Sequence, residues 1–294
     1  MPGRRGDPDI GVLILTLDTL QIQPALFRHL AQQGWSLSEP VPLHGGRSNH
    51  VWRAGDVVVK LYRRQRANPL FANDPERERA ALLTLGGSGI APRFLGHGRW
   101  QGRDWLIYRH VSGTPWRNGA AQVARFLGVL HQQAGFSGLP AGCNGSQELA
   151  AQTGAILAEC AAPDDLYQVA PRGAVPPTRH LCLIHGDAVP GNLVVRETRL
   201  ALIDWQCPQR GDPAEDLALF LSPAMQFLYR GAVLSPDEET EFTSAYPVRE
   251  VVARYHALKP WFHWRMAAYC QWRGDLEARD LEMAALQSMS PSSP

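Results

Sequence analysis

The chain has 294 residues and a mass of 32.5 kDa, enough for about two domains and a sizeable hydrophobic core. Its 29 Lys and Arg residues almost balance its 28 Asp and Glu residues, giving a formal charge of +1 at pH 7. This balance argues against a dedicated nucleic-acid binder, which would carry an excess of basic charge. No apolar stretch approaches the roughly 18 residues of a membrane helix. We therefore expect a soluble, cytoplasmic protein with no nucleic-acid or membrane partner.

Two residue types are distributed in an informative way. The five cysteines are scattered, without the paired spacing of metal ligands, and we expect reduced thiols that are mostly buried. Only two of the 29 basic residues are lysines, Lys60 and Lys259. Arginine fills nearly every position at which either cation would serve, so the placement of each lysine carries information.

The first part of the chain is predicted to be rich in strands. Residues 1–20 have no clear partner in the rest of the sequence and are interpreted as a loose N-terminal extension. Pro24 to Gln33 is typical of a short helix, with proline in the first turn and Gly34 as the stop. Short β-branched runs separated by glycine turns then span residues 41–62, which predicts an antiparallel meander.

The next elements are a helix and a strand, followed by a change of character. Asn73-Asp74-Pro75-Glu76 is a helix-start signal, and helix formers continue to Leu85. Trp105 to Tyr108 is typical of a strand. From residue 112 onward helical patterns dominate, at 123–130, 148–160, 215–229 and 249–273, with a compact hairpin pattern at 181–204.

These patterns predict an α+β protein with two lobes. The N-terminal lobe, residues 21–111, is β-rich, and the C-terminal lobe, residues 112–287, is mainly helical. Residues 288–294 are expected to be a frayed tail.

The most informative stretch runs from Leu181 to Trp205. An apolar run leads to a polar loop with Asp187 and Asn192, and two short strand-like runs then flank a turn. If that hairpin is centred near Thr198, paired residue numbers sum to 396, which places Asn192 directly across from Asp204. An amide oxygen and a carboxylate side by side suit a hard divalent cation such as Mg²⁺.

Asp187 lies on the same loop, five residues before Asn192. It could accept the proton of an attacking hydroxyl close to that metal, which is the arrangement that phosphoryl transfer needs. Asp-Gly turns and hairpin ends are also rich in Asp and Asn for purely local bonding. We favour the functional interpretation because the three residues occur together, after an apolar strand and around one hairpin.

The motifs His185-Gly186-Asp187 with Asn192, Ile203-Asp204-Trp205, and the run from Gly211 to Ala218 resemble the aminoglycoside phosphotransferase and choline kinase superfamily. The resemblance extends over nearly the whole chain from about residue 35. It implies a bilobal, protein-kinase-like fold and an ATP-dependent small-molecule kinase. By that resemblance Asp187 is the catalytic base, Asn192 and Asp204 hold Mg²⁺, and Asp216 anchors the catalytic loop from the following helix.

The same resemblance assigns residues of the N-terminal lobe to ATP. Lys60 ends a valine-rich strand, where the family places a cation for the α- and β-phosphates, and a compact ammonium suits that role. A carboxylate of the next helix should orient it. Glu76 and Glu78 are the candidates, and family spacing favours Glu78, although both could merely complement the helix N-terminus.

Two further segments are assigned to the nucleotide. The turn with Gly45, Gly46 and Ser48 would offer backbone N–H groups to the phosphates. The backbone of Arg109 and Val111 would pair with adenine. The family often has an acidic residue where Arg109 stands, a departure without consequence if only the backbone is used.

Two histidines are interpreted as scaffold rather than as bases: His185 would orient the loop, and His131 would pack at a helix end. Only eleven residues separate Asp204 from Asp216, too few for the activation segment of a protein kinase. The expected partner is therefore a small hydroxyl acceptor rather than a protein.

The acceptor itself stays open. The aromatic residues of 255–272 could hold a quaternary or heterocyclic cation such as choline or thiamine, although a packed core helix is the preferred interpretation. Acidic residues at 237–241 could attract a polyamine sugar, or could belong to a solvated helix start. A nucleotide-binding pseudokinase and an atypical protein kinase remain the alternatives to a small-molecule kinase.

Overall fold

The computed structural model describes residues 8–43, 48–64 and 68–289. The chain divides into two compact units. The N-terminal unit comprises residues 1–67 and 73–111, and the C-terminal unit comprises residues 68–72 and 112–294. The short segment Asn68–Ala72 thus belongs to the C-terminal unit although it lies between two parts of the N-terminal one.

Helix α1 spans Pro8–Gln32 and contains Pro24 in its interior. The helix start predicted at Pro24 is therefore wrong, and residues 8–20 are helical rather than a loose extension. Proline removes one backbone hydrogen bond from a helix, but here packing outweighs that loss. Leu26 and Leu30 are fully buried with Trp52 in the core of the N-terminal unit.

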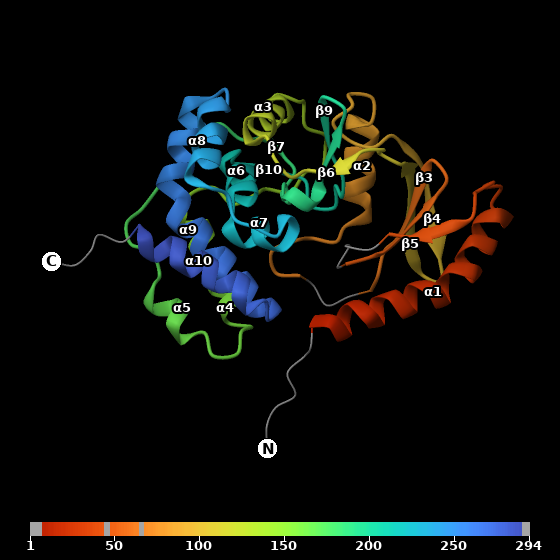
Figure 1. The fold of residues 1–294 in the computed structure, drawn as a ribbon, viewed down its shortest axis with the longest axis horizontal. Coiled ribbons are helices and arrows are strands. Elements are labelled where there is room, and N and C mark those ends of the chain that lie inside the picture. Colours follow the sequence, from red (N-terminus) through yellow and green to blue (C-terminus); the bar gives the residue numbers. More distant parts are fainter. Residues whose placement is uncertain (1–7, 44–47, 65–67, 290–294) are drawn as a thin grey trace, which may run out of the picture. The chain divides into compact units, whose positions relative to one another are not determined.

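The N-terminal unit is built on an antiparallel sheet with strand order β1-β2-β3-β5-β4 (Figure 1). The strands are β1 (Pro40–Pro42), β2 (His50–Ala54), β3 (Val57–Leu61), β4 (Phe94–Trp100) and β5 (Arg103–Arg109). The predicted meander and the strand at 105–108 are confirmed, whereas β4 was not foreseen. Helix α2 (Pro75–Leu85) follows the predicted cap, because the Asp74 side chain accepts from the N–H groups of Glu76 and Arg77.

Helices form most of the C-terminal unit: α3 (Ala120–Leu130), α4 (Ser146–Leu157), α5 (Asp164–Gln168), α6 (Ala214–Leu221), α7 (Pro223–Arg230), α8 (Pro236–Ala245), α9 (Arg249–Arg273) and α10 (Leu276–Ser288). The helical pattern predicted at 215–229 is two helices, because Ser222 leaves the helical conformation and caps α7. The tail predicted at 288–294 lies almost entirely outside the described residues.

Two small sheets of the C-terminal unit carry the polar loop. Strand β7 (Cys182–Ile184) pairs with β10 (Gln209–Gly211). Strand β6 (Thr114–Pro115) pairs with β8 (Leu193–Arg196), and β8 forms a hairpin with β9 (Arg199–Leu202). The 3₁₀ turn η1 (Pro190–Asn192) connects the loop to β8.

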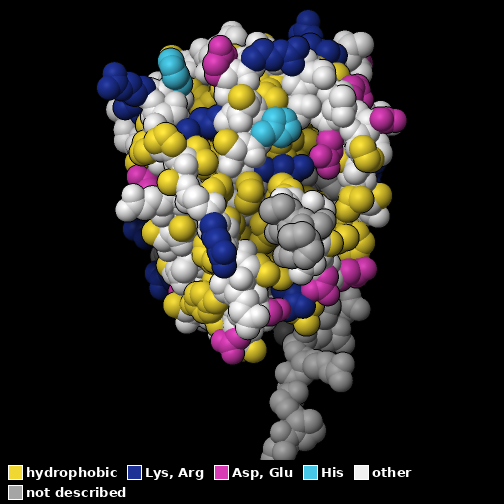
Figure 2. Space-filling model, turned by 90° about the vertical axis from the view of Figure 1, so that its left-hand side faces the viewer, with side chains coloured by type: hydrophobic (Ala, Val, Ile, Leu, Met, Phe, Trp, Pro, Cys, Tyr) yellow, Lys and Arg dark blue, Asp and Glu magenta, His cyan; other side chains and the backbone are white. Residues whose placement is uncertain are grey.

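On the face drawn in Figure 2, basic, acidic and apolar side chains are interspersed, and neither sign of charge dominates. No helix within the described residues is long and apolar enough to cross a membrane. All five cysteines are free thiols, as predicted, but the expectation that most are buried is wrong, because only Cys207 and Cys270 are buried and the other three are half-buried.

Candidate active site

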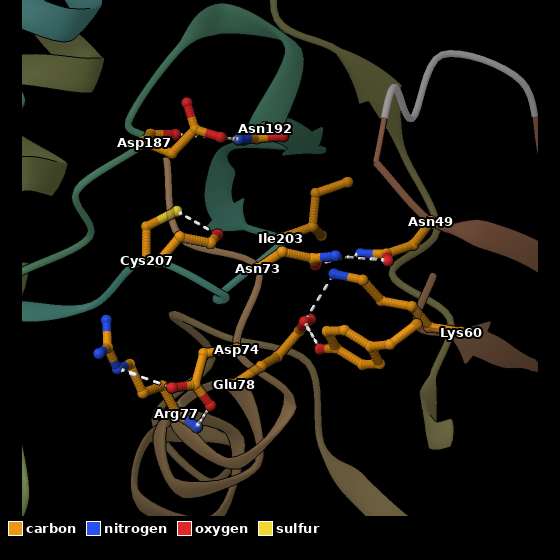
Figure 3. Close-up of polar contacts among 12 residues, drawn as sticks. Asn49, Lys60, Asn73, Asp74, Arg77, Glu78, Asp187, Asn192, Ile203 and Cys207 are labelled. Carbon is orange, nitrogen blue, oxygen red and sulfur yellow. Dashed lines mark hydrogen bonds and ion pairs between the residues drawn. The ribbon is translucent and has the colours of Figure 1, made fainter. Parts of the chain in front are cut away.

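A buried ion pair joins β3 to α2 in the N-terminal unit. Lys60 Nζ lies 2.6 Å from Glu78 Oε2, and the two side chains are only 3% and 1% exposed. The Tyr62 hydroxyl donates a second hydrogen bond to the same carboxylate oxygen. Figure 3 shows the lysine and glutamate side chains pointing toward each other. The carboxylate therefore fixes the ammonium in one place at the end of the strand.

Glu76, the other candidate partner of the lysine, is used elsewhere. Its carboxylate binds Arg79 at 2.5 Å on the solvent side of α2, where the Glu76 side chain is 64% exposed. The N-cap at Asp74 sets the start of the helix, and this start decides which glutamate lies on the buried face. The structure thus brings Lys60 together with Glu78 and not with Glu76.

The other residues assigned to the nucleotide are placed only in part. Gly45 and Gly46 lie outside the described residues, and Ser48 is a half-buried residue shortly before β2. The N–H of Arg109 donates to the Arg93 carbonyl at 2.9 Å, so of its two backbone groups only the carbonyl could serve a ligand. Val111 is the last residue of the N-terminal unit.

The polar loop after β7 joins Asp187 to Asn192. Asn192 Nδ2 donates to Asp187 Oδ2 at 3.0 Å and to the Asp187 backbone carbonyl at 2.9 Å. The Val189 N–H donates to the same carbonyl at 2.9 Å. These bonds close the loop and set the amide beside the carboxylate, as Figure 3 shows.

The start of the loop is held by hydrogen bonds to a buried carboxylate of α6. Asp216 is fully buried and accepts from the backbone N–H groups of His185 at 2.8 Å and Gly186 at 2.9 Å. His131 Nε2 lies 3.1 Å from Asp216 Oδ2, and its Nδ1 lies 2.7 Å from the Tyr246 hydroxyl. The predicted anchoring role of Asp216 is confirmed, and His131 sits at the end of α3 as expected.

The charge state of Asp216 follows from these bonds. Burial is the largest influence and by itself raises its pKa, but the hydrogen bond and charge of His131, with the donors of His185, hold the pKa below its ordinary value. The anchor is therefore an ionised carboxylate with strong acceptor oxygens. Sequence reasoning missed Tyr246, for which the local pattern gives no signal.

His185 is fully buried and orients the loop. Its Nε2 donates to the Ile203 carbonyl at 3.1 Å, and its Nδ1 accepts from the Asp187 N–H at 3.2 Å. Burial lowers the pKa of His185, against the opposing charges of Asp216 and Asp204. The ring is therefore neutral, with both nitrogens engaged, and cannot act as the catalytic base.

Gly186 is a position that only glycine can fill. Its φ is +73°, and a Cβ atom there would lie 2.3 Å from the Cys207 carbonyl oxygen. A side chain would therefore push the loop away from the segment after β9. This is the physical reason for glycine between His185 and Asp187.

The hairpin register differs from the prediction by one residue. Leu193 pairs with Leu202 and Arg196 with Arg199, so residue numbers sum to 395 rather than 396. Asn192 consequently faces Ile203, whose N–H donates to the Asn192 carbonyl at 2.9 Å. The turn has two residues, and Glu197 takes a positive φ of 52° in it. Because a one-residue slip exchanges the two faces of a strand, the predicted Asn192–Asp204 pair is wrong.

Asp204 lies beyond the ladder, two residues after β9 ends. It adopts a φ of +64°, a conformation that costs a non-glycine residue energy and that clusters at functional sites. Leaving the strand in this way releases the carboxylate from the alternation of the hairpin. The position of Asp204 after β9 is thus set by its backbone conformation and not by the cross-strand pairing with Asn192 that the sequence predicted.

The donor atoms near the loop fit a hard cation. Because Asn192 Nδ2 is bonded to Asp187, the amide atom that remains for a metal is Oδ1. This oxygen and the Asp204 carboxylate are the ligand type that Mg²⁺ prefers. The described residues hold no group of three or more His, Cys, Asp and Glu side chains suited to a metal.

The surroundings of the loop in the C-terminal unit are aromatic. The Tyr229 ring packs on Gly191, where a Cβ atom would lie 2.3 Å from it. Tyr269 stacks on Trp272 at 5.9 Å and meets the edge of Phe71 at 5.0 Å. Burial raises the pKa of Tyr269 to about 12, and the negative charge of Asp187 contributes. Its hydroxyl is therefore a neutral donor.

Phe71 belongs to the segment Asn68–Ala72, which sequence reasoning missed. The Asn68 side chain accepts from the N–H groups of Leu70 and Phe71 at 3.0 and 2.8 Å, and it donates to the Tyr269 hydroxyl at 3.0 Å. The Asn68-Pro69 dipeptide was the available signal, since such pairs start turns.

The acidic residues at 237–241 and the aromatic residues of 255–272, both candidates for contact with the acceptor, also have structural roles. Glu238 forms a capping box with Ser235 and pairs with Arg230, and Glu239 pairs with Lys259. The aromatic residues of α9 that are buried in the core are Tyr255, Trp261, Phe262, Trp264 and Tyr269. The preferred core interpretation of this stripe is correct for these residues, and Trp272 is half-buried.

A β-rich unit with a buried Lys–Glu pair and a helical unit with a suspended Asp-Asn loop define the kinase-like fold of small-molecule phosphotransferases. The family model described as "Phosphotransferase enzyme family" matches residues 39–279. The chain belongs to this family.

Solved structures share the fold at low sequence identity. A choline/ethanolamine kinase family protein from Mesorhizobium loti is 16% identical with a TM-score of 0.63, over 86% of this chain and 89% of that one. The choline kinase LicA from Streptococcus pneumoniae is 16% identical with a TM-score of 0.62, over 90% and 98%. An aminoglycoside phosphotransferase from Streptomyces rimosus, in complex with ADP and streptomycin, is 18% identical with a TM-score of 0.53, over 81% and 98%. No curated protein matches the chain.

Proposed function

We propose that the protein is an ATP-dependent kinase that transfers the γ-phosphoryl group to a hydroxyl of a small, amine-bearing acceptor. The observation that supports this most is the Asp187–Asn192 loop. Three hydrogen bonds close it, and two backbone N–H groups at its start donate to the ionised Asp216. Phosphoryl transfer needs little covalent chemistry from the protein and depends on positioning and charge. A carboxylate fixed this tightly meets that need.

In the proposed reaction Asp187 accepts the proton of the acceptor hydroxyl as its oxygen bonds to the γ-phosphorus. The bond from that phosphorus to the bridging oxygen breaks, ADP leaves, and the proton passes from Asp187 to water. Asn192 Nδ2, which donates to Asp187 Oδ2, directs the carboxylate.

The remaining residues would bind the nucleotide. Lys60, oriented by Glu78, would bind the α- and β-phosphates, and Gly45, Gly46 and Ser48 would offer N–H groups to them. The carbonyl of Arg109 and the N–H of Val111 would pair with adenine. Asn192 Oδ1 and Asp204 would hold Mg²⁺, which when bound neutralises phosphate charge and orients the phosphates.

A second candidate acceptor is a choline- or thiamine-type cation rather than a polyamine sugar. Of the four acidic residues at 237–241, three are engaged, by Arg230, by Lys259 and by the Ala121 N–H. These carboxylates are thereby less suited to attract a polycation. The half-buried indole of Trp272, which stacks on the buried Tyr269, offers an aromatic face instead, and Asp187 is close enough to influence the Tyr269 pKa.

The test is consumption of ATP by the purified protein with Mg²⁺ across acceptors that include aminoglycosides, choline, ethanolamine and thiamine. Asp187→Asn should lower turnover by about 10²- to 10⁴-fold and leave ATP binding nearly unchanged. Asp164→Asn, at an exposed position on α5, is the matched control and should keep full turnover. Unchanged turnover in Asp187→Asn would refute the role of the base.

Asp204→Ala should raise the Mg²⁺ concentration needed for half-maximal turnover. An unaltered metal dependence would contradict the assignment of Asp204. ATP binding with no turnover on any acceptor would favour a nucleotide-binding pseudokinase. Absence of ATP binding would refute the kinase proposal as a whole.

A further inference from the structure

The C-terminal unit has a hollow that does not include the catalytic loop. Its volume is about 390 Å³, which falls in the range of small-molecule sites. It is lined by the loop after α3 and by strands β7 and β10. Asp187, Asn192 and Asp204 are not among the residues that line it.

The walls of this hollow combine apolar side chains with an almost equal share of polar surface. Phe136 and Leu139 contribute from the loop after α3, and Leu181 and Leu183 from the chain at and before β7. The polar side chains are those of Gln133, Cys182 and Arg210. The Gln133 amide nitrogen already donates to the Val129 carbonyl at 2.9 Å. An occupant would therefore meet apolar and polar surface in similar shares, which suits a molecule with an apolar body and a polar end.

Arg210 is the only charged residue among those that line the hollow. Both of its backbone groups are held by one segment, because its N–H donates to the Pro140 carbonyl and its carbonyl accepts from the Gly142 N–H. Its side chain is exposed, and within the described residues the guanidinium makes no hydrogen bond or ion pair. A fixed backbone thus presents an unengaged planar cation at the edge of a partly apolar hollow, and this cation is complementary to a carboxylate.

Cys182 does not add covalent or metal chemistry to the hollow. Burial, together with the charges of Asp216 and Asp212, raises the pKa of its thiol to about 12. The thiolate is the reactive and metal-binding form, and it is scarce at neutral pH. The carboxylates of Asp216 and Asp212 are themselves engaged by His131 and Arg254. Recognition in this hollow is therefore non-covalent.

We propose that this hollow binds a small carboxylate with an apolar body, the apolar part between Phe136, Leu139 and Leu181 and the carboxylate on Arg210. The two strands beneath such a ligand pair Leu183 with Arg210. They continue directly into His185 at the start of the catalytic loop and into Asp212 before α6. The ligand would thus occupy a site separate from that of the phosphoryl acceptor.

The test uses 3-phenylpropionate as the probe, with the neutral 3-phenylpropionamide and the small anion acetate as matched ligands. Binding is followed by NMR on protein labelled at leucine methyl groups, with nucleotide and acceptor absent. Signals of Leu139, Leu181 and Leu183 are assigned by single Leu→Val substitutions. We expect saturable shifts of these signals with a Kd of about 4 mM, the affinity that the ligand efficiency of drug-sized ligands implies for a probe of this size.

The amide should bind about fivefold more weakly than the acid, and acetate should not shift these signals. Arg210→Gln should weaken binding of the acid about fivefold at low ionic strength. Arg199→Gln, another exposed strand arginine of the same unit, should have no effect. Equal affinity for acid and amide, binding unaltered in Arg210→Gln, or no saturation up to about 10 mM would overturn the proposal.

Discussion

The buried ion pair of Lys60 and Glu78 allows a sharp test of how the N-terminal unit holds its cation. In Glu78→Gln the side chain keeps its size and one acceptor oxygen but loses its charge. Lys60 then stays 3% exposed and loses the charge of Glu78, which lies 2.6 Å away in the wild type. Breaking a buried pair by removing one partner costs about 3–5 kcal/mol. The retained amide oxygen can still accept from Lys60 and Tyr62, so we expect the lower end, a loss of about 3 kcal/mol in the free energy of unfolding.

The assay is urea denaturation alongside ATP kinetics. Glu76→Gln is the matched control on the same helix, because its ion pair with Arg79 is largely exposed and should contribute within about 0.5 kcal/mol. Glu78→Gln should also raise the KM for ATP about tenfold or more, and Glu76→Gln should not. In a double-mutant cycle, Lys60→Met combined with Glu78→Gln should cost less than the sum of the single changes. Equal stability losses in the two glutamate variants, or strict additivity in the cycle, would refute the reasoning.

Three further changes probe the C-terminal unit. Glu282 is fully buried and accepts from Ser222, the Ala224 N–H and His263. Glu282→Leu should therefore lower the free energy of unfolding, measured by urea denaturation, by about 3–5 kcal/mol. A loss under about 1 kcal/mol would show that these donors find other acceptors. The pKa of His185 is lowered in the folded protein, so the unfolded state binds its proton first as the pH falls. The contribution of His185 to stability is therefore fully present above pH 6.5 and falls by up to about 1.4 kcal/mol per pH unit below it. In urea denaturation at several pH values, the free energy of unfolding should depend less steeply on pH in His185→Gln than in the wild type, and equal pH dependence would contradict the assignment. Gly186→Ala should reduce turnover at least about tenfold because its Cβ would meet the Cys207 carbonyl oxygen at 2.3 Å, and wild-type turnover would show that the loop can shift without cost.

The elements that the sequence predicted well are those with a local chemical signal. Asp74 before Pro75 marks the start of α2, and the cap observed there is the one expected. The polar loop after β7 was predicted because Asp187 and Asn192 follow an apolar run at short spacing, and the structure brings these two residues together. In both cases the residues that decide the structure are neighbours in the chain.

The elements that were missed depend on packing with distant residues. Strand β4 contains Gly96 and Gly98, which weaken any strand signal in the sequence. In the structure a Cβ atom at these positions would lie 2.3 Å from the Trp35 ring and 2.5 Å from the Trp105 ring. The glycines are therefore where two indoles come close to the strand, and nothing local indicates this.

The candidate site shows the same division. The identity of the polar residues was predictable, but their geometry was not, because the register depends on a two-residue turn at Glu197 and the position of Asp204 on a left-handed backbone. Likewise, the part of α1 before Pro24 is helical although proline is a common helix start. The hairpin register, the backbone conformation of Asp204 and the start of α1 are thus determined by tertiary packing and not by the local residue pattern.

The placement of Asn68–Ala72 has a consequence for dissection of the protein. The polypeptide passes between the two units after residues 67, 72 and 111, so no single cut separates them. A fragment ending at residue 111 would carry Leu70 and Phe71, which are 9% and 8% exposed in the intact chain, without the helices that cover them. A fragment beginning at residue 112 would lack the two side chains that complete its own core. Limited proteolysis between the units should therefore yield pieces that stay associated until denatured, and neither piece should refold alone as a monomer.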